Sequence, residues 1–336
     1  MKIGIMSFAH VHAAGYARLL AGIPGAEVVA ADPGEHSDDE VRGAMLAAEA
    51  GVYYLDDYDD LFTWGPDAVI ITSENARHRA DVERAAAAGA HILCEKPLAT
   101  SWEDGLAIRD VVARAGVICM LAHPVRFSSA FARLQAQHRA GALGEIVAIR
   151  GANNGMLPTE RAWFTDPQLA GGGALVDHIV HLADLIDALT GATPRRVTAT
   201  SNRTLYPDRP VESTALTLIE YDDGMIAALD SSWSVPQKAP AWGGLRMSVL
   251  GTAGTVDVDV FGSAARGVSS DGMAVEARYG ADLDAAMLGC FLEAVRTGVQ
   301  PKPDVETGLR TLSVVLAAQE SARTGQAVDV GNLLSP

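Results

Sequence analysis

The chain of 336 residues carries the pair Glu95 and Lys96 directly after the apolar run HILC. We expect this run to be a buried strand, so both groups would lie at the carboxyl edge of a sheet, where open α/β sheets bind ligands. A lysine there can donate a hydrogen bond to a reacting hydroxyl, stabilise developing negative charge and lose its proton readily when desolvated. The alternative is an ordinary Glu/Lys pair in a surface loop.

A second candidate site lies in the segment GGGALVDHIVH, which we expect to be helical. Asp177 and His181 are then one turn apart on one face, so the carboxylate can orient the imidazole or raise its basicity. Histidine is the usual acid/base group for a hydroxyl proton, and His178, about 100° around the helix from Asp177, could line the same pocket. A solvated aspartate beside a core histidine is the alternative. A metal bound by these three side chains is disfavoured because no partner carboxylate pattern accompanies them, and we predict no metal.

The stretch GIMSFAHVHAAG follows the first apolar run, where a dinucleotide-binding protein carries the loop G-x-G-x-x-G. The three motif positions hold Gly4, Met6 and Ala9, so the second glycine is replaced. Either the pyrophosphate lies farther from the strand than usual, or cofactor binding is weak, or the stretch is an ordinary strand-to-helix turn. For the first case we predict cofactor contacts from Ser7, Phe8, Ala9 and His10.

Asp32 ends the next apolar run, EVVAAD, where a carboxylate can accept hydrogen bonds from the adenosine ribose hydroxyls. The same carboxylate would repel a ribose phosphate, so NAD is favoured over NADP. His36 and Arg42 lie close enough in sequence to keep the choice open. The alternative for Asp32 is a turn residue before Pro33.

The elements that position these residues follow from the hydrophobic pattern. Up to about residue 122, short apolar runs alternate with helical segments, which is typical of βαβ units and a doubly wound parallel sheet. We expect strands at 2–6, 27–32, 67–72, 91–94 and 117–122 and helices at 12–23, 38–51, 80–89 and 102–116. The fold class is therefore α/β, with a Rossmann dinucleotide-binding domain at 1–122.

Residues 123–336 show a different order of helical and strand patterns. Helical patterns at 131–141, 171–191, 282–298 and 306–325 accompany strand patterns at 145–152, 195–202, 212–221, 225–234, 245–252 and 255–262. We expect an α+β substrate domain with an open, mostly antiparallel sheet. A broad sheet face without helices is usually covered by another subunit, so we predict a homodimer or homotetramer formed through this sheet.

Composition narrows the class of protein. Acidic residues outnumber basic ones by 42 to 26, for a formal charge of -16, and no basic cluster could bind phosphates in series, so nucleic acid and anionic membranes are excluded as expected partners. We see no secretory leader and no apolar run near 18 residues, and we expect a cytoplasmic protein. The three cysteines, Cys94, Cys119 and Cys290, lack a C-x-x-C pair and are expected to be free buried thiols.

Together these features resemble the Gfo/Idh/MocA family of NAD(P)-dependent sugar and polyol oxidoreductases. The resemblance covers most of the chain, through the first loop ending in His12, the stretch TSENARHRADVERAAAAGAHILCEKPLA, the segment VRFSSAFARLQAQHRAGALGEI and WFTDPQLAGGGALVDHIVHLADLIDALTG. Two residues depart from the family pattern. Met6 replaces the second glycine of the first loop. Ile179 stands where the family often has glycine, two residues after Asp177, and would either reshape the substrate pocket or reflect tighter packing.

The resemblance implies roles for individual residues. Lys96 would contact the nicotinamide ribose and the substrate, and Asp177 and His181 would form the substrate-binding and acid/base pair. The cofactor would be lined by Thr72, Asn75, His78 and Glu95. His123, at the domain junction, would lie near the nicotinamide and the substrate, and Arg126 and Trp163 would be pocket or scaffold residues.

We therefore expect reversible hydride transfer between NAD and a hydroxyl carbon of a sugar, inositol or related polyol. One alternative is a cofactor-dependent sensor on the same fold, which Met6 favours, because a fold does not determine function. Another is an epimerase or eliminase that oxidises a sugar transiently and reduces it again.

Overall fold

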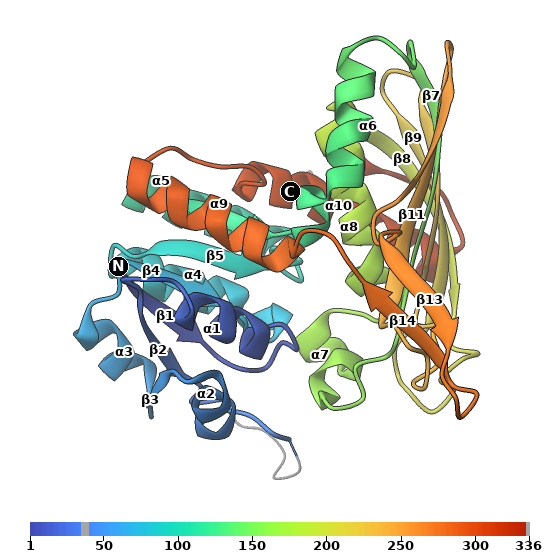
Figure 1. Ribbon diagram of the computed structural model, residues 1–336. Helices are drawn as coiled ribbons and strands as arrows, with labels where there is room; N and C mark the ends of the chain where they lie inside the picture. Colours follow the sequence, from blue (N-terminus) through green and yellow to red (C-terminus); the bar gives the residue numbers. More distant parts are fainter. Residues whose placement is uncertain (35–39, 334–336) are drawn as a thin grey trace. The chain divides into compact units, whose positions relative to one another are not determined.

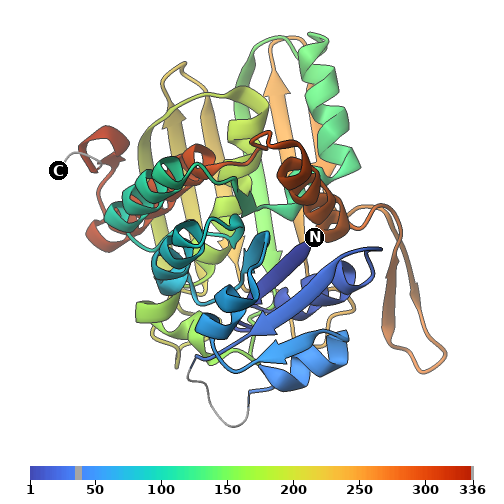
Figure 2. The ribbon, with the colours of Figure 1, turned by 90° about the vertical axis from the view of Figure 1, so that its left-hand side faces the viewer.

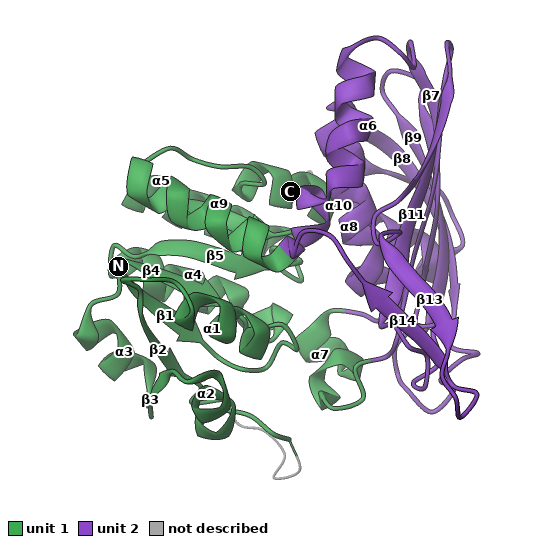
Figure 3. Ribbon diagram, in the orientation of Figure 1, with its two compact units in different colours: residues 1–123, 158–171, 284–312 green, residues 124–157, 172–283, 313–336 purple. Residues whose placement is uncertain are grey.

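The computed structural model describes residues 1–34 and 40–333 (Figure 1). The chain forms two compact units, shown in different colours in Figure 3. Unit 1 consists of residues 1–123, 158–171 and 284–312, and unit 2 of residues 124–157, 172–283 and 313–336. The predicted domain boundary at residue 122 therefore matches only the first passage of the chain from unit 1 to unit 2. Two later segments, 158–171 and 284–312, belong to unit 1 again. A hydrophobic pattern does not indicate such returns, since it reports the type of an element and not the sheet on which it packs.

Unit 1 contains a six-stranded sheet of order β3-β2-β1-β4-β5-β6 in which every pairing is parallel. The strands are β1 (Lys2–Met6), β2 (Glu27–Ala31), β3 (Tyr53–Leu55), β4 (Ala68–Ile71), β5 (His91–Glu95) and β6 (Cys119–Ala122). All five predicted strands of this region are confirmed. Their apolar runs are buried on both faces, as a sheet covered by helices on each side requires.

Five helices of unit 1 connect these strands: α1 (Ala13–Ala21), α2 (Ala44–Ala50), α3 (Tyr58–Trp64), α4 (His78–Ala87) and α5 (Trp102–Ala115). Two more, α7 (Pro167–Ala170) and α9 (Leu283–Thr297), belong to the segments that return to unit 1. Helix α1 packs on α2, and α4 packs on α5. Because βαβ crossovers share one hand, the pair before the strand-order reversal and the pair after it lie on opposite faces of the sheet.

Two local differences from prediction appear near residue 45. Helix α2 begins only at Ala44, because Gly43 before it has φ +58° and cannot continue a helix backwards. The short strand β3 and helix α3 were not predicted, since three residues at a sheet edge leave little periodic signal. His36, which kept the cofactor choice open, lies outside the described residues.

Unit 2 contains a seven-stranded sheet of order β12-β11-β7-β10-β9-β8-β15. Its strands are β7 (Ile146–Gly155), β8 (Pro194–Asn202), β9 (Thr214–Tyr221), β10 (Ile226–Ser232), β11 (Gly243–Gly251), β12 (Thr255–Asp259) and β15 (Val328–Asp329). Strands β7 and β10 pair in parallel and every other pairing is antiparallel, which confirms the mostly antiparallel sheet. A separate hairpin, β13 (Ala264–Val268) with β14 (Ala274–Arg278), was not predicted.

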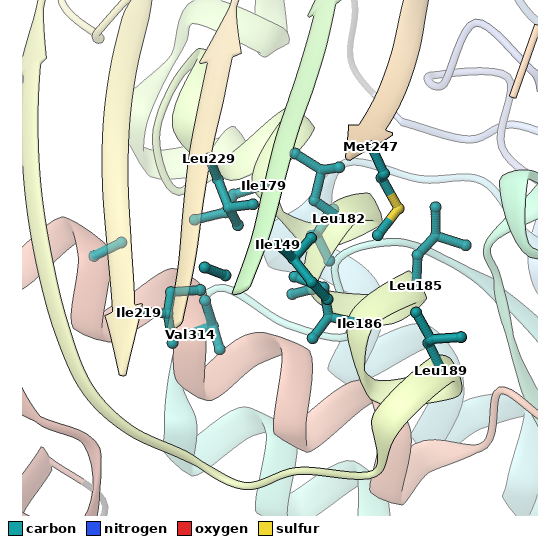
Figure 4. Close-up of a cluster of buried hydrophobic side chains, with 14 of the residues drawn as sticks. Ile149, Ile179, Leu182, Leu185, Ile186, Leu189, Ile219, Leu229, Met247 and Val314 are labelled. Atoms are coloured by element: carbon teal, nitrogen blue, oxygen red, sulfur yellow. The ribbon is translucent and has the colours of Figure 1, made fainter. Parts of the chain in front are cut away.

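Helices cover one face of this sheet. They are α6 (Ser129–Arg139), α8 (Ala174–Thr190), the second half of α10 (Val305–Thr324) and the short α11 (Val330–Leu333). In Figures 1 and 2 the longer helices lie on one side of the strands. The close-up in Figure 4 shows Leu182 and Ile186 of α8 beside Ile149 of β7, within one continuous core. This packing orients α8, which carries the second candidate site.

The packing of α8 against the unit 2 sheet also explains its apolar composition. The stretch Pro167–Thr190 is long and apolar enough to span a membrane, yet 78% of its most apolar window is buried inside the protein. A mostly buried core helix and a membrane span can have similar compositions, so the position of α8 in the core accounts for its apolar residues.

Candidate active site

The loop after β1 uses a serine where the backbone needs a left-handed turn. Ser7 has φ +76°, while Met6 is fully buried as the last residue of β1. Gly4 also lies inside this strand, against Leu61 of α3, so neither motif position forms the turn. The departure at Met6 therefore does not alter the loop, because Ser7 carries the conformation that glycine normally provides.

The amides of this loop are already hydrogen-bonded within unit 1. Ser7 N donates to Ala31 O at 2.8 Å, Ala9 N to Ser7 Oγ at 3.0 Å and His10 N to Thr72 O at 2.9 Å. These bonds fix the conformation of the loop, and the predicted cofactor contacts from Ser7, Phe8, Ala9 and His10 stay a prediction. Two of these partners, Ala31 and Thr72, lie far from the loop in sequence, so the hydrophobic pattern does not indicate them.

The carboxylate of Asp32, just after β2, accepts hydrogen bonds from Ser7 and Arg42. Its Oδ1 accepts from Ser7 Oγ and from Arg42 Nη2, each at 2.8 Å, and its Oδ2 accepts from Arg42 Nε at 3.0 Å. Arg42 Nη1 also donates to Glu74 Oε1 at 3.1 Å. Burial alone would lower the pKa of Arg42, but the bonds and charges of Asp32 and Glu74 raise it.

The residues predicted to line the cofactor hold neighbouring loops together. Thr72 Oγ1 donates to Ser7 O at 2.7 Å, and Asn75 Nδ2 donates to Ala170 O at 2.9 Å. His78 Nδ1 lies 2.9 Å from Pro97 O. Burial lowers the pKa of His78, which favours the neutral imidazole, and the ring joins the β4 loop to the β5 loop. All three lie at the carboxyl edge of the sheet.

Glu95, the last residue of β5, is the centre of a buried polar cluster. Its Oε1 accepts from Tyr16 OH at 2.8 Å, and His12 Nδ1 lies 3.0 Å and His10 Nδ1 3.7 Å from the same oxygen. Burial alone would raise the pKa of Glu95, but the charges of His10 and His12 hold it well below the usual range. The carboxylate therefore stays ionised directly beside Lys96.

The charge of Glu95 shifts the pKa values of two other members of the cluster, His12 and Tyr16. Burial alone would lower the pKa of His12, but Glu95 raises it through its charge and hydrogen bond. Burial and the same carboxylate raise the pKa of Tyr16 well above its usual value. Tyr16 was not predicted, although its position four residues after His12 on α1 was a usable signal.

The atoms of His10, His12 and Glu95 could together hold a cation, since they lie within 4.8 Å of one another. The hydrogen bonds from Tyr16 and His12 to the carboxylate explain this arrangement without one. The predicted absence of a metal therefore remains a prediction.

Lys96 is 4% exposed, and its backbone N donates to Glu95 Oε2 at 3.2 Å. It follows β5 directly, at the carboxyl edge of the sheet where ligands of doubly wound folds bind. His123 is likewise buried, just after β6. The alternative of a surface Glu/Lys loop is excluded, because both side chains are inside the protein.

The returning segment 158–171 packs on the first loop of unit 1. Trp163 Nε1 donates to Ala9 O at 2.9 Å, and the Trp163 and Phe164 rings stack at 4.0 Å. Both are buried in one cluster with Ala9 and Ala170. Trp163, predicted as a pocket or scaffold residue, thus supports the loop after β1.

In unit 2, α8 is helical through both candidate residues, as predicted. Asp177 and His181 are half-buried on a helix whose neighbouring positions are buried. Asp177 Oδ2 accepts from Trp233 Nε1 at 3.0 Å and lies 3.5 Å from His178 Nε2. Trp233 was not predicted, because it belongs to a distant strand region. The pairing of Asp177 with His181 stays a prediction.

His178 fits closely against β7. It is 6% exposed, and a Cβ on Gly155 would lie 2.8 Å from its Cε1. Asn153 Nδ2 donates to His178 O at 3.1 Å. Ile179, the other departure from the family pattern, is fully buried in the unit 2 core, which favours tighter packing over a reshaped pocket.

The start of α8 explains its three glycines. Glu212 Oε1 accepts from Gly173 N at 2.7 Å and from Leu175 N at 3.1 Å, so a side chain from far along the chain caps the helix. A Cβ on Gly173 would lie 2.0 Å from Glu212 O. Glycine is required there because the two backbones touch.

Arg126 has a structural partner. Its Nε donates to Asp184 Oδ2 at 2.9 Å and its Nη2 to Oδ1 at 2.5 Å, and Asp184 is fully buried in α8. A forked pair of this kind occupies the guanidinium. Of the two roles left open for Arg126, the geometry favours scaffold over substrate pocket.

Comparison with known proteins identifies the family. Residues 3–123 match the model of the oxidoreductase family with an NAD-binding Rossmann fold, and residues 131–257 match the GFO/IDH/MocA C-terminal domain. Among curated relatives, D-xylose 1-dehydrogenase (NADP(+)) 2 of Haloferax volcanii is 31% identical over 88% of this chain and 90% of that protein. The scyllo-inositol 2-dehydrogenase (NAD(+)) of Bacillus subtilis is 28% identical over 98% of this chain and 95% of that protein.

Solved structures agree on the fold. GenD2 from gentamicin A biosynthesis, solved in complex with NAD, superposes with a TM-score of 0.86 at 23% identity and covers 98% of this chain and 96% of that one. With the motifs around Lys96 and Asp177 in place, the family matches lead to one conclusion. The chain belongs to the Gfo/Idh/MocA family and is an NAD(P)-binding oxidoreductase.

Proposed function

We propose that this enzyme transfers a hydride reversibly between NAD and a hydroxyl-bearing carbon of a sugar, inositol or related polyol. The observation that carries the proposal is the burial of Lys96, directly after β5 and beside an ionised Glu95. Relatives that match most of the chain are named as sugar and inositol dehydrogenases. Neither a buried lysine nor a buried carboxylate at a sheet edge is needed for folding, and both are costly to bury.

The residues at the carboxyl edge of the unit 1 sheet fit a dinucleotide. Asp32 follows β2, where the adenosine ribose of such cofactors binds. Nearby, Arg161 is 8% exposed, and its Nε has no hydrogen-bond partner in the part of the chain that the structure describes. A buried donor of this kind suits a ligand that brings acceptors. When bound, the nicotinamide accepts or donates the hydride.

The chain's own residues handle the proton and the charge. In the oxidative direction His181 accepts the hydroxyl proton, Asp177 binds a neighbouring substrate hydroxyl and orients the imidazole, and Lys96 stabilises the developing alkoxide. These roles rest on the match of each residue to the family motif. We also propose a cytoplasmic location and a homodimer or homotetramer formed through the unit 2 sheet.

Replacing the proposed catalytic residues tests this mechanism. We expect Lys96→Met and His181→Asn each to lower kcat by about 10²- to 10⁴-fold, because each removes proton transfer or charge stabilisation in the transition state. Binding of NADH, followed by fluorescence, should persist. Lys238→Met, at an exposed position, is the matched control. Near-normal turnover in both variants would eliminate the assignment.

A substrate panel tests the reaction class. Sugars, inositols and their keto forms should be assayed with NAD and NADP in parallel, at the NADH absorbance. Stoichiometric NADH accumulation supports net dehydrogenation, whereas product without NADH would indicate transient oxidation in an epimerase or eliminase. The sensor alternative loses its support, because Met6 belongs to β1 and not to the loop.

A further inference from the structure

Trp233, directly after β10, is a buried hydrogen-bond partner of the candidate residue Asp177. Its indole Nε1 donates to Asp177 Oδ2 at 3.0 Å. Trp233 is 1% exposed, and because Nε1 is the only polar atom of its side chain, the buried ring requires an acceptor. A backbone carbonyl would satisfy this donor equally well. Here the acceptor is a carboxylate whose side chain is 16% exposed and therefore accessible to a ligand.

Packing fixes the direction of this N–H. Trp233 lies in a buried apolar cluster with Leu157, Ala174 and Val211. Ala174 is the first residue of α8, so the ring packs against the same turn of helix that carries Asp177. Side chains in a densely packed core keep their rotamers, and the indole N–H is therefore aimed by its apolar neighbours.

The backbone around the ring is held as well. Trp233 N donates to Ser213 O at 3.0 Å, just before β9. The preceding residue, Ser232, accepts at its Oγ from Asn154 Nδ2 of β7 at 2.8 Å. The end of β10 is thus attached on both sides, and Trp233 cannot move without disturbing the sheet.

A second ring lies beside the same carboxylate oxygen. His178 Nε2 is 3.5 Å from Asp177 Oδ2, and the imidazole fits closely against Gly155 of β7. Oδ2 therefore faces an indole on one side and an imidazole on the other. Rotation of the carboxylate group would break the bond from Trp233, so that bond sets the orientation of Asp177.

We propose that Trp233 is a positioning residue for substrate binding, because its N–H holds the Asp177 carboxylate at the angle at which it accepts a substrate hydroxyl. This role rests on the proposed function, in which Asp177 binds a hydroxyl next to the reacting one. A carboxylate that turns freely must be ordered whenever substrate binds, whereas a preorganised one avoids that cost. Loss of the bond should therefore weaken substrate binding.

Trp233→Phe removes the N–H and keeps an aromatic ring in the cluster. With the sugar or inositol of the substrate panel that is turned over fastest, we expect KM to rise about tenfold and kcat to fall less than about threefold. The hydroxyl bond is made in the ground state and in the transition state alike, so its loss appears in KM. Trp102→Phe, at the start of α5, is the matched control and should leave both constants unchanged. A Trp233→Phe protein that loses stability but keeps the wild-type KM would overturn the role.

A double-mutant cycle shows whether Trp233 acts through Asp177. In an Asp177→Ala background, Trp233→Phe should change kcat/KM less than about twofold, because the carboxylate that it positions is gone. A structural role of the ring would lower kcat/KM by the same factor in both backgrounds, and that result would contradict the proposal.

The bond itself is measured in the intact protein without substrate. The chain has five tryptophans, so its ¹⁵N spectrum contains five indole N–H signals, and the one missing from Trp233→Phe belongs to Trp233. That signal should shift in Asp177→Ala, whereas the signal missing from Trp102→Phe should not. An unmoved Trp233 signal overturns the positioning role while the dehydrogenase assignment stands. Absence of turnover with every sugar and inositol of the panel, despite a shifted signal, overturns the proposed function and the positioning role with it.

Discussion

Glu95 is an ionised carboxylate inside the protein, and its neighbours are what keep it ionised. An isolated buried carboxylate would take up a proton, but Tyr16 donates to it and the two imidazoles lie within 3.7 Å. Because Lys96 follows in sequence, this negative charge is fixed beside the proposed alkoxide-stabilising group. The cluster thus provides a counter-charge for a buried lysine.

This cluster predicts a pH dependence. The pKa of His12 is raised by Glu95, so the charge pair contributes fully below about pH 6.5, the usual value for histidine, and is lost as pH rises through the raised value. Glu95→Gln should therefore lower the pKa of His12 to below the ordinary histidine value, because burial then outweighs the remaining charge of Asp284. It should also cost about 1–3 kcal/mol of stability.

NMR titration of the His12 imidazole and chemical denaturation across pH measure both effects. Glu83→Gln, an exposed carboxylate on α4, is the control. An unchanged His12 titration in Glu95→Gln would contradict the assigned cause of the shift.

At the scale of elements, α8 owes its position to the glycines before it. The capping carboxylate of Glu212 reaches the first turn only because Gly173 lets the two backbones meet. Arg126 and Asp184 then anchor the middle of the helix to the segment after His123. The candidate residues Asp177 and His181 are thus carried on a rigid element, which suits a site that must position substrate.

Gly173→Ala should destabilise the protein by about 1–3 kcal/mol, because its Cβ would overlap the Glu212 carbonyl. Gly289→Ala, within α9 and with no atom within 4 Å of the added Cβ, should be neutral or stabilising by up to about 1 kcal/mol. Urea denaturation of both variants provides the comparison. Equal stability of the two would show that the start of α8 can shift without cost.

At the scale of the whole molecule, the face of the unit 2 sheet opposite its helices carries exposed apolar side chains. Its exposed side chains include Leu216 and Leu218 of β9 and Ile226 of β10. Within the described residues, the helices of unit 2 lie on the other face. Adjacent apolar side chains on one face are typical of a subunit interface.

Charging this face should dissociate the predicted oligomer. We expect Leu216→Lys with Leu218→Lys to lower the sedimentation coefficient toward that of a monomer, because two buried charges at an interface cost several kcal/mol. Val299→Lys, at an exposed apolar position in unit 1, should leave assembly unchanged. A wild-type protein that sediments as a monomer at micromolar concentration would exclude the oligomer.

The sequence by itself determined the elements and much of their chemistry. Apolar runs and helical periodicity identified the five longer parallel strands and α8, so Lys96 at a strand end and Asp177 with His181 on one helical face followed from local pattern. These features depend on neighbours along the chain, and hydrophobic periodicity records them directly.

Only the tertiary structure decided the long-range polar contacts. The bond from Ser7 to Asp32, the packing of Trp163 on the loop after β1 and the cap of Glu212 on α8 all join segments far apart in sequence. Irregular loops position these groups, and loops carry no periodic signal from which their partners could be inferred. The chemistry of Asp32 depends on those contacts, because neighbouring groups, and not the identity of Asp32 alone, determine what its carboxylate can accept.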